Sequence, residues 1–235
     1  MKLLAFDTST PWLSVALQDD GRVLERSEHV GHAHSSRLLP LVDALLAEAG
    51  VALAALDAIA FGAGPGAFTG VRIACGVAQG LGLGADRPLV AVSTLEALAH
   101  TAWRTHGWTD VVACLDARMR EVYLGRYARA GEGWRVMHDE AVLAPADAQV
   151  DAFAPARAHV AFGAGDGFAA YPELASRLHL EHVDAPLRPE ARALLELAAP
   201  RVRAGDVVDA AAALPLYVRH RVALTTAERS AGLRL

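Results

Sequence analysis

A five-residue stretch that occurs twice constrains this chain most. The pentapeptide AFGAG stands at Ala60–Gly64 and again at Ala161–Gly165, each time after an apolar segment and before one with helical spacing. A second landmark repeats in the same order, because the first apolar strand expected in each half ends in an aspartate, Asp7 in FDTST and Asp116 in LDARM. Two landmarks in parallel order predict an internal duplication. We therefore expect an α/β fold of two lobes, with duplicated mixed sheets flanked by helices.

The first half shows the alternation of strands and helices that such a lobe requires. We expect strands at residues 2–7, 13–18, 23–29, 56–61 and 89–92, and helices at residues 35–49, 69–84 and 93–105. Ser35 or Ser36 is the expected N-cap of the first helix, and Gly50 its C-terminal stop. After THGWTD the pattern restarts, with strands expected at residues 110–115 and 121–127 and a weaker one near 134–136. We place a first lobe at residues 1–105 and a second, reduced lobe with the C-terminal segment at residues 106–235.

The composition is that of a globular protein that needs no cross-link. Hydrophobic residues make up 53% of the 235 residues and charged residues 21%, and a chain of this length buries about 70–75% of its unfolded surface. Cys75 and Cys114 lie far apart in apolar segments, which predicts buried free thiols. The sequence shows no apolar run long enough for a membrane span or a signal peptide, so we expect a cytoplasmic protein. The net charge of −5 argues against a broad phosphate-binding surface.

The glycine-rich run AFGAGPGAF at residues 60–68 has the position of a phosphate-binding loop but lacks its chemistry. A Walker loop carries a lysine beside its last glycine, whereas Gly66 is followed by AFTGVR and Lys2 is the only lysine in the chain. The dinucleotide pattern GxGxxG also fails, because position 67 is alanine. Two interpretations stay open. In the first, backbone amides at the start of the next helix hold an anion. In the second, the run is a turn that packs the helix tightly on its strand.

Two helices of the first lobe, those expected at residues 35–49 and 69–84, have more apolar or smooth surface than one buried face requires. Gly76, Gly80 and Gly84 recur every four residues in the helix expected at 69–84, and each costs about 1 kcal/mol relative to alanine. Their spacing predicts a ridge that another backbone approaches closely. In the helix at 35–49, Leu39 and Leu46 widen the apolar arc. Either this helix is enclosed within one chain, or a partner protein covers its second side.

Two further clusters of polar residues have a chemical and a structural interpretation. His29, His32 and His34 lie close together, but the neighbouring sequence adds no cysteine or glutamate to complete a zinc site, which favours a polar loop. Asp7 and Asp116 follow strands, where ligands sit in such sheets. Facing carboxylates suit magnesium–nucleotide chemistry, and each aspartate alone suits a turn. The pattern GxSxG of α/β-hydrolases does not occur.

Six segments resemble one bacterial family, and they occur in order along both halves of the chain. They are LLAFDTSTPWLSVAL, HSSRLLPLVDALL, AFGAGPGAFTGVRIACGVAQGL, PLVAVSTLEALA, CLDARMREVYLGRY and LPLYVRHRVA. Together they closely resemble the TsaB (YeaZ) family. The resemblance implies the two-lobed fold of actin and the sugar kinases, which is ribonuclease H-like. It also implies a role in tRNA threonylcarbamoyladenosine modification, at the adenosine next to the anticodon of tRNAs that read ANN codons, with the catalytic paralogue TsaD and the ATPase TsaE as partners.

The same resemblance implies that the chain is not an enzyme by itself. In the catalytic paralogue, the segment similar to PLVAVSTLEALA carries two metal-binding histidines, and the matching positions here are Thr94 and Leu98, with His100 out of register. Leucine cannot ligate a metal, and a lone threonine hydroxyl is a poor ligand. We expect no cofactor on this chain alone, with ATP and a metal on the partner subunits. The alternatives are an ATP- and magnesium-dependent phosphotransferase of the actin-like fold, using Asp7 and Asp116, and a metallopeptidase.

The family's partners dock through two helices of the first lobe, which match the helices at 35–49 and 69–84. The candidate partner-binding residues are Leu38, Leu39, Val42, Leu45, Leu46, Arg72, Ile73, Gly76, Val77 and Gly80. The positions of a vestigial phosphate loop are Asp7, Thr8, Ser9, Gly64, Gly66 and Asp116. We expect a homodimer through the same surface when the partner is absent, because an exposed apolar patch associates.

Several arginines leave the question of tRNA contact open. Arg118, Arg120 and Arg126 in the second lobe, and Arg219 and Arg221 near the end, are either phosphate contacts or solvated side chains. The solvated interpretation is favoured for each, so tRNA is expected to reach this chain only through the complex.

Overall fold

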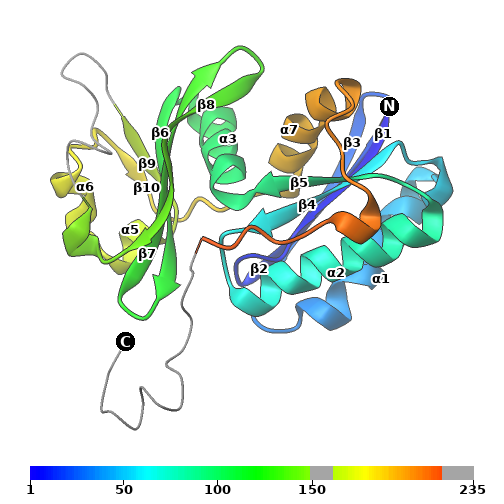
Figure 1. Ribbon diagram of the computed structural model, residues 1–235, viewed down its shortest axis with the longest axis horizontal. Coiled ribbons are helices and arrows are strands. Elements are labelled where there is room, and N and C mark those ends of the chain that lie inside the picture. Colours follow the sequence, from blue (N-terminus) through cyan, green and yellow to red (C-terminus); the bar gives the residue numbers. More distant parts are fainter. Residues whose placement is uncertain (149–160, 219–235) are drawn as a thin grey trace, which may run out of the picture.

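The computed structural model describes residues 1–148 and 161–218, which form two lobes side by side (Figure 1). Each lobe is built on a five-stranded sheet. The strands of the first sheet are β1 (Lys2–Asp7), β2 (Trp12–Asp19), β3 (Arg22–His29), β4 (Ala58–Gly64) and β5 (Leu89–Ser93). Those of the second are β6 (Asp110–Arg118), β7 (Glu121–Ala130), β8 (Gly133–Leu143), β9 (Phe162–Ala164) and β10 (Val183–Asp184).

The two sheets have the same topology. The first has the order β3-β2-β1-β4-β5 and the second the matching order β8-β7-β6-β9-β10. In each, the first three strands form an antiparallel meander, and the fourth and fifth run parallel to the first. The two AFGAG segments fall on the equivalent strands β4 and β9. The predicted duplication and the α/β fold class are confirmed.

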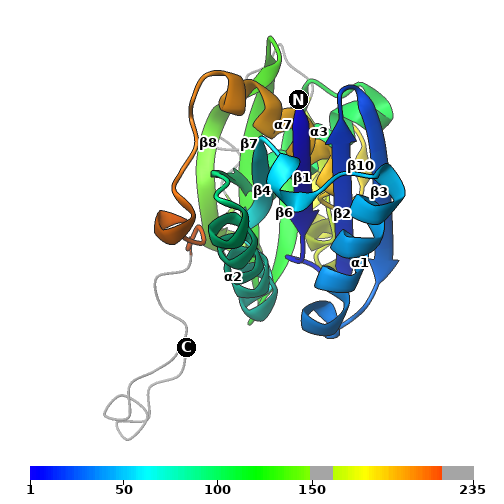
Figure 2. The ribbon, with the colours of Figure 1, turned by 90° about the vertical axis from the view of Figure 1, so that its right-hand side faces the viewer.

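Helices cover both faces of each sheet. They are α1 (His34–Ala49), α2 (Phe68–Ala85), α3 (Thr94–His106), α5 (Gly167–Ala170), α6 (Glu173–Arg177) and α7 (Ala191–Arg203), with short 3-10 turns at Leu53–Ala55, Pro145–Asp147 and Ala210–Ala212. In Figure 1, α1 and α2 lie on one side of the first sheet and α7 on the other. Figure 2 shows α1 and α2 next to each other.

Alternation along the strands explains this layering. In β1, Leu4 and Phe6 pack under α1 and α2, whereas Leu3 and Ala5 pack under α7. In the second lobe, α3 packs on one face of the sheet, and α5 and α6 on the other. The helix α7 thus comes from the second half of the sequence and packs on the first sheet. The division of the chain at residue 105 stays a prediction.

Two details of the expected elements are wrong. The N-cap of α1 is Ala33, and the Ser36 hydroxyl donates instead to the Ala33 carbonyl at 3.0 Å, so the serines lie inside the first turn. Gly50 does end the helix, with a left-handed φ of 67°. The weak strand expected near 134–136 is longer than predicted, because it is the 11-residue β8. Pairing with β7 stabilises this strand although its mixed sequence has only a weak strand pattern.

The remaining general expectations can be compared with the described residues. Cys75 and Cys114 are buried free cysteines, as predicted. Among the helices of residues 1–148 and 161–218, none is long and apolar enough to cross a membrane.

Candidate functional site

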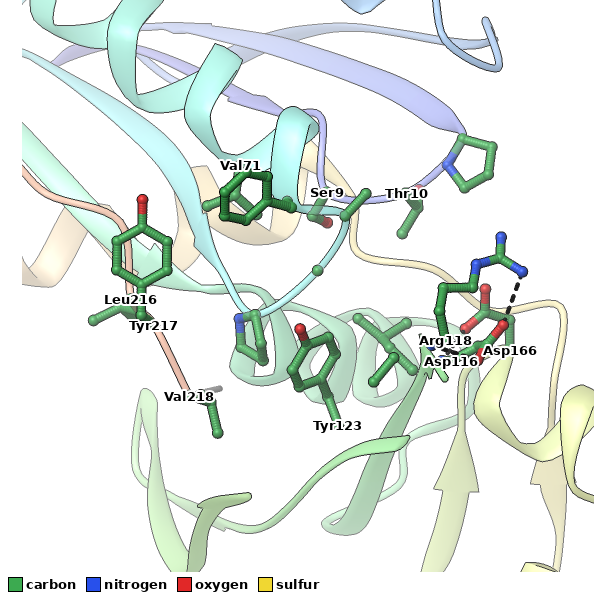
Figure 3. A pocket seen from close by; sticks show the side chains of 17 residues that line it. Ser9, Thr10, Val71, Asp116, Arg118, Tyr123, Asp166, Leu216, Tyr217 and Val218 are labelled. Carbon is green, nitrogen blue, oxygen red and sulfur yellow. Dashed lines mark hydrogen bonds and ion pairs between the residues drawn. The ribbon is translucent and has the colours of Figure 1, made fainter. Parts of the chain in front are cut away.

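A cleft of about 230 Å³ lies between the lobes, where the strand ends of both sheets meet (Figure 3). It is lined by Ser9, Thr10, Pro11, Pro65, Gly66, Ala67, Phe68, Val71, Leu115, Asp116, Ala117, Arg118, Tyr123, Asp166, Leu216, Tyr217 and Val218. These residues lie in the segments that follow β1, β4 and β9, at the end of β6, in β7, in the first turn of α2, or in the C-terminal segment, which we define as residues 207–218. Ligands of open α/β sheets bind at such strand ends.

Asp7 lies at the end of β1 and is almost completely buried. Its Oδ1 accepts hydrogen bonds from the Ser9 backbone N–H at 2.9 Å and the Ser9 hydroxyl at 2.6 Å. Its Oδ2 faces Gly62, where an added Cβ would lie 1.9 Å away, and it has no hydrogen-bond partner among the described residues. Burial raises the pKa of Asp7 to about 6, against the lowering effect of the Ser9 hydrogen bonds. Asp7 is not among the described residues that line the cleft.

The glycine-rich run is held against the turn that follows β1. A Cβ on Gly70 would lie 1.9 Å from the Thr8 carbonyl oxygen, and one on Gly66 would lie 2.6 Å from the Ser9 Cβ. The Thr8 hydroxyl donates to the Gly70 carbonyl at 2.7 Å, and the Ala67 N–H donates to the Ser9 carbonyl at 2.8 Å. Protein atoms therefore occupy the concave side of the run. This contact favours the interpretation of the run as a turn that fixes the start of α2.

On the other side of the cleft, Asp116 and Asp166 form hydrogen bonds and an ion pair with residues of the second lobe. The carboxylate of Asp116 accepts from the Arg118 backbone N–H at 2.9 Å and pairs with the Arg118 guanidinium at 3.0 Å. The Asp166 carboxylate accepts from the Asp116 N–H at 3.0 Å, and burial raises the pKa of Asp166. The described residues assemble no group of three or more metal-ligating side chains. Asp116 lines the cleft, whereas Asp7 is not among the described residues that line it. The magnesium–nucleotide alternative stays a prediction.

The positions that match the paralogue's metal ligands belong to the core. The buried Thr94 hydroxyl accepts from a backbone N–H at the end of β4 at 3.2 Å, and Leu98 is buried under the second sheet. His100 is buried as well. Its Nε2 lies 2.8 Å from a Glu196 carboxylate oxygen, and its Nδ1 accepts from the Trp134 indole N–H at 3.2 Å. Both ring nitrogens of His100 are thus occupied.

The histidines near α1 also have structural surroundings. His29 packs edge-on against Trp12 at 5.3 Å between ring centroids, His34 is buried at the start of α1, and His32 is exposed. They lie on a strand end, a loop and a helix start. This arrangement agrees with the polar-loop interpretation.

The candidate partner residues on α1 divide into buried and exposed positions. Leu38, Val42, Leu45 and Leu46 are buried within this chain, whereas the Leu39 side chain is 43% exposed. Enclosure within the chain accounts for the first four, so Leu46 of the widened arc is core and Leu39 is not. A partner surface on α1 would have to use Leu39.

The candidate residues on α2 are more open. Arg72, Gly76 and Gly80 are exposed, and Ile73 and Val77 are half-buried. A Cβ added at Gly76 or Gly80 would meet no atom of the described residues within 4 Å, so the glycines form the smooth ridge that their spacing predicts. Its use as a partner surface stays a prediction.

The C-terminal segment lies along α2, a contact that sequence reasoning missed. The Leu216 N–H donates to the Ala63 carbonyl at 2.7 Å, and the Gln79 side chain donates to the Ala213 carbonyl at 2.9 Å. A Cβ on Gly64 would lie 2.9 Å from the Leu216 carbonyl oxygen, so this glycine permits the close approach. The apolar LPLY stretch indicates that this segment packs against the protein, but the sequence does not show which surface it covers.

Arg126 corrects both interpretations offered for it. It is neither a phosphate contact nor a solvated side chain, because it is buried and donates to both carboxylate oxygens of Asp110, at 2.9 and 2.7 Å. Arg118 and Arg120 are exposed. Arg219 and Arg221 lie outside the described residues.

Two matching sheets, interleaved helices and a cleft at the strand ends define a two-lobed protein of the actin-like α/β class. The family model described as "TsaD: tRNA N6-adenosine threonylcarbamoyltransferase" matches residues 27–161. The TsaB protein of Escherichia coli K12, named for tRNA threonylcarbamoyladenosine biosynthesis, is 41% identical over 95% of this chain and 96% of its own. The TsaB protein of Haemophilus influenzae is 39% identical over 94% and 95%.

Solved structures agree with these relatives. The chain is similar to YeaZ from Pseudomonas aeruginosa with a TM-score of 0.86 and 48% identity, over 92% of this chain and 99% of that one. A second structure from the same organism, described as similar to peptidase YEAZ, gives a TM-score of 0.87 and 49% identity, over 93% and 99%. The chain therefore belongs to the TsaB family.

Proposed function

We propose that this chain is a non-catalytic subunit needed for threonylcarbamoyladenosine modification of tRNA in the cytoplasm. In this role it binds and stabilises the catalytic subunit TsaD and works with the ATPase TsaE at the adenosine next to the anticodon of ANN-decoding tRNAs. The names of its relatives in E. coli and H. influenzae support the pathway. ATP and the metal would be held by the partner subunits.

The observation that carries the non-catalytic role is the burial of the positions that match the paralogue's metal ligands. Thr94 and Leu98 are inaccessible, and the Thr94 hydroxyl already has a partner. The carboxylates of Asp7 and Asp116 are held by Ser9 and by Arg118. This arrangement stabilises a fold and presents little chemistry to a substrate.

Partner binding is assigned to the exposed side of α2 and to Leu39 of α1. Gly76 and Gly80 leave the helix surface flat, so the backbone of a partner helix can approach without displacing side chains. Half-buried Ile73 and Val77 provide apolar area beside them. A homodimer through this surface, in the absence of TsaD, follows from the same exposed apolar area.

Reconstitution tests the proposal. Purified TsaD and TsaE, supplied with ATP, an activated threonylcarbamoyl donor and substrate tRNA, should form the modified nucleoside only when this chain is added, as measured by mass spectrometry of tRNA digests. Gly80→Trp should abolish TsaD binding and modification together, while circular dichroism of the variant is unchanged. Full modification without this chain would contradict the proposal.

Calorimetry of the isolated chain with ATP and magnesium distinguishes the phosphotransferase alternative from the proposed non-catalytic role. Our proposal expects no heat of binding up to millimolar nucleotide. Saturable binding, followed by phosphate transfer that Asp116→Asn removes, would favour the enzyme instead.

A further inference from the structure

Arg72, in the second turn of α2, is held rigidly on the surface. Its guanidinium lies over the Phe68 ring, 3.5 Å from the ring centroid, which is a cation–π contact. Its Nε donates to the Tyr217 hydroxyl at 3.0 Å, and its guanidinium lies 5.6 Å from the Tyr217 ring centroid. Figure 3 shows Tyr217 arriving from the C-terminal segment beside the start of α2. An arginine held over one ring and hydrogen-bonded to another has already lost most of its rotamer freedom.

The charge of Arg72 has no carboxylate partner among the described residues. A guanidinium carries five N–H donors, and only the Nε–H is used within the described part of the chain. Other arginines of the chain do pair with carboxylates. They are Arg26, Arg37, Arg104, Arg118, Arg126, Arg192, Arg201 and Arg203. The four terminal N–H groups of Arg72 therefore form an unused fork, which matches a carboxylate in shape.

The surroundings of this fork are apolar and exposed. Phe68, Leu216 and Tyr217 all expose more than 40% of their surface and line the same side of the cleft, and together with Arg72 we call them the Arg72 patch. One arginine among aromatic and aliphatic side chains is the composition of an energetic centre in protein–protein interfaces. A site for a nucleic-acid backbone instead gathers several cations, and the Arg72 patch contributes one, in a chain of net charge −5.

We propose that Arg72 is a preorganised anchor for a carboxylate side chain of TsaD, at the end of α2 nearest the cleft. This inference rests on the proposed function, because it names the chemistry of the partner that the α2 surface binds. The anchor extends that surface from the glycine ridge onto the C-terminal segment. Tyr217 acts as a positioning residue, since it orients the guanidinium and leaves the terminal N–H groups free.

Titration calorimetry of the full chain with purified TsaD tests the anchor. Arg72→Ala should weaken binding by about 10- to 100-fold, the range for hydrogen bonds between charged groups. Arg72→Lys should lose most of the same affinity, because an ammonium cannot form the fork or stack as a plane. Tyr217→Phe should cause a smaller loss, of about three- to tenfold. The control is Arg203→Ala, which removes an exposed arginine of α7 paired with Glu132 and should change affinity less than twofold.

Three outcomes separate this inference from the proposed function. If Arg72→Ala and Arg72→Lys bind TsaD normally while Gly80→Trp does not, the function stands and the anchor is overturned. If the unmodified chain does not bind TsaD, both fall. If Arg72→Ala leaves TsaD binding unchanged and lowers affinity for tRNA, the fork holds phosphate and the inference is overturned. Support beyond affinity would come from Arg72→Glu being rescued by an aspartate- or glutamate-to-lysine substitution in TsaD.

Discussion

The two AFGAG segments end in glycines of similar conformation but lead into very different helices. Gly64 and Gly165 have nearly equal backbone angles, with φ of 107° and 112°. After the first, the chain forms the 18-residue α2, and after the second only the four-residue α5. A four-residue helix is enough to close the turn in the second lobe. The extra length of α2 is thus not needed for the turn, and it carries the exposed side to which we assign partner binding.

The glycines after each turn also differ in what they touch. The atom nearest to a Cβ on Gly70 is the backbone carbonyl oxygen of Thr8, at 1.9 Å. The atom nearest to a Cβ on Gly167 is the side-chain sulfur of Cys114, at 2.2 Å, with Cys114 backbone atoms at 3.0 and 3.1 Å. Backbone cannot move without disturbing the sheet, and a side chain can. Alanine should therefore be tolerated less well at Gly70 than at Gly167.

Gly70→Ala should have the largest effect. Its Cβ would lie 1.9 Å from the Thr8 carbonyl oxygen, so α2 or β1 must shift, and we expect a loss of about 4 kcal/mol or more in the free energy of unfolding. Urea denaturation followed by circular dichroism measures this loss. A loss of unfolding free energy below about 1 kcal/mol would show that this turn tolerates an added methyl group at least as well as the turn at Gly167.

Asp7, in the turn region of the first lobe, should make the stability of the protein depend on pH. Burial raises the pKa of its carboxyl from 3.8 to about 6, so the native state binds a proton more tightly than the unfolded chain. The associated stability is fully present below pH 4 and is lost as pH rises through 6, by about 3 kcal/mol. In Asp7→Asn this decline between pH 4 and pH 7 should disappear from urea unfolding curves. An unchanged pH profile would contradict the assignment.

Gly167→Ala tests the second lobe directly. The added Cβ would lie 2.2 Å from the Cys114 sulfur, and rearrangement of that side chain should limit the loss of stability to about 2 kcal/mol. The measurement is the same urea titration as for Gly70→Ala. A loss as large as that of Gly70→Ala would remove the distinction between the two turns.

Gly80→Ala should have the smallest effect and the opposite sign. The new methyl group would meet no described atom within 4 Å, and alanine favours a helix interior by about 1 kcal/mol. Thermal unfolding should therefore show a modest increase in stability. A decrease would show that the outer side of α2 is in contact with something in the isolated chain, for example a second copy, which sedimentation would detect.

Local patterns in the sequence predicted the elements of the first lobe well. The strand at Lys2–Asp7 has the expected bounds, and α2 and α3 begin and end within one residue of expectation, because period-two and period-3.6 spacing reflect local geometry. The duplication was visible because the turn requires glycine at equivalent positions. The N-cap of α1 was missed because Ser36 satisfied the sequence rule, whereas its hydroxyl donates to the Ala33 carbonyl and does not accept from a backbone N–H as a cap would.

Contacts between distant segments could not be predicted from such patterns. The pairing of Arg126 with Asp110 depends on the register of β6 and β7, and the contact of Arg72 with Tyr217 joins residues 145 positions apart. Four candidate partner residues on α1 are core because α1 packs on the sheet with its broad apolar arc. Spacing showed that the arc was wide, but not that this chain itself covers it.

The position of α7 has a consequence for synthesis on the ribosome. One face of the first sheet, including Leu3 and Ala5, is covered by Leu194 and Leu197 of α7, about 190 residues later in translation. At 5–20 residues per second, roughly 10–40 seconds pass before that cover exists. During that interval the nascent amino-terminal half exposes an apolar sheet face, and exposed apolar surface of this kind is prone to aggregation before the chain is complete.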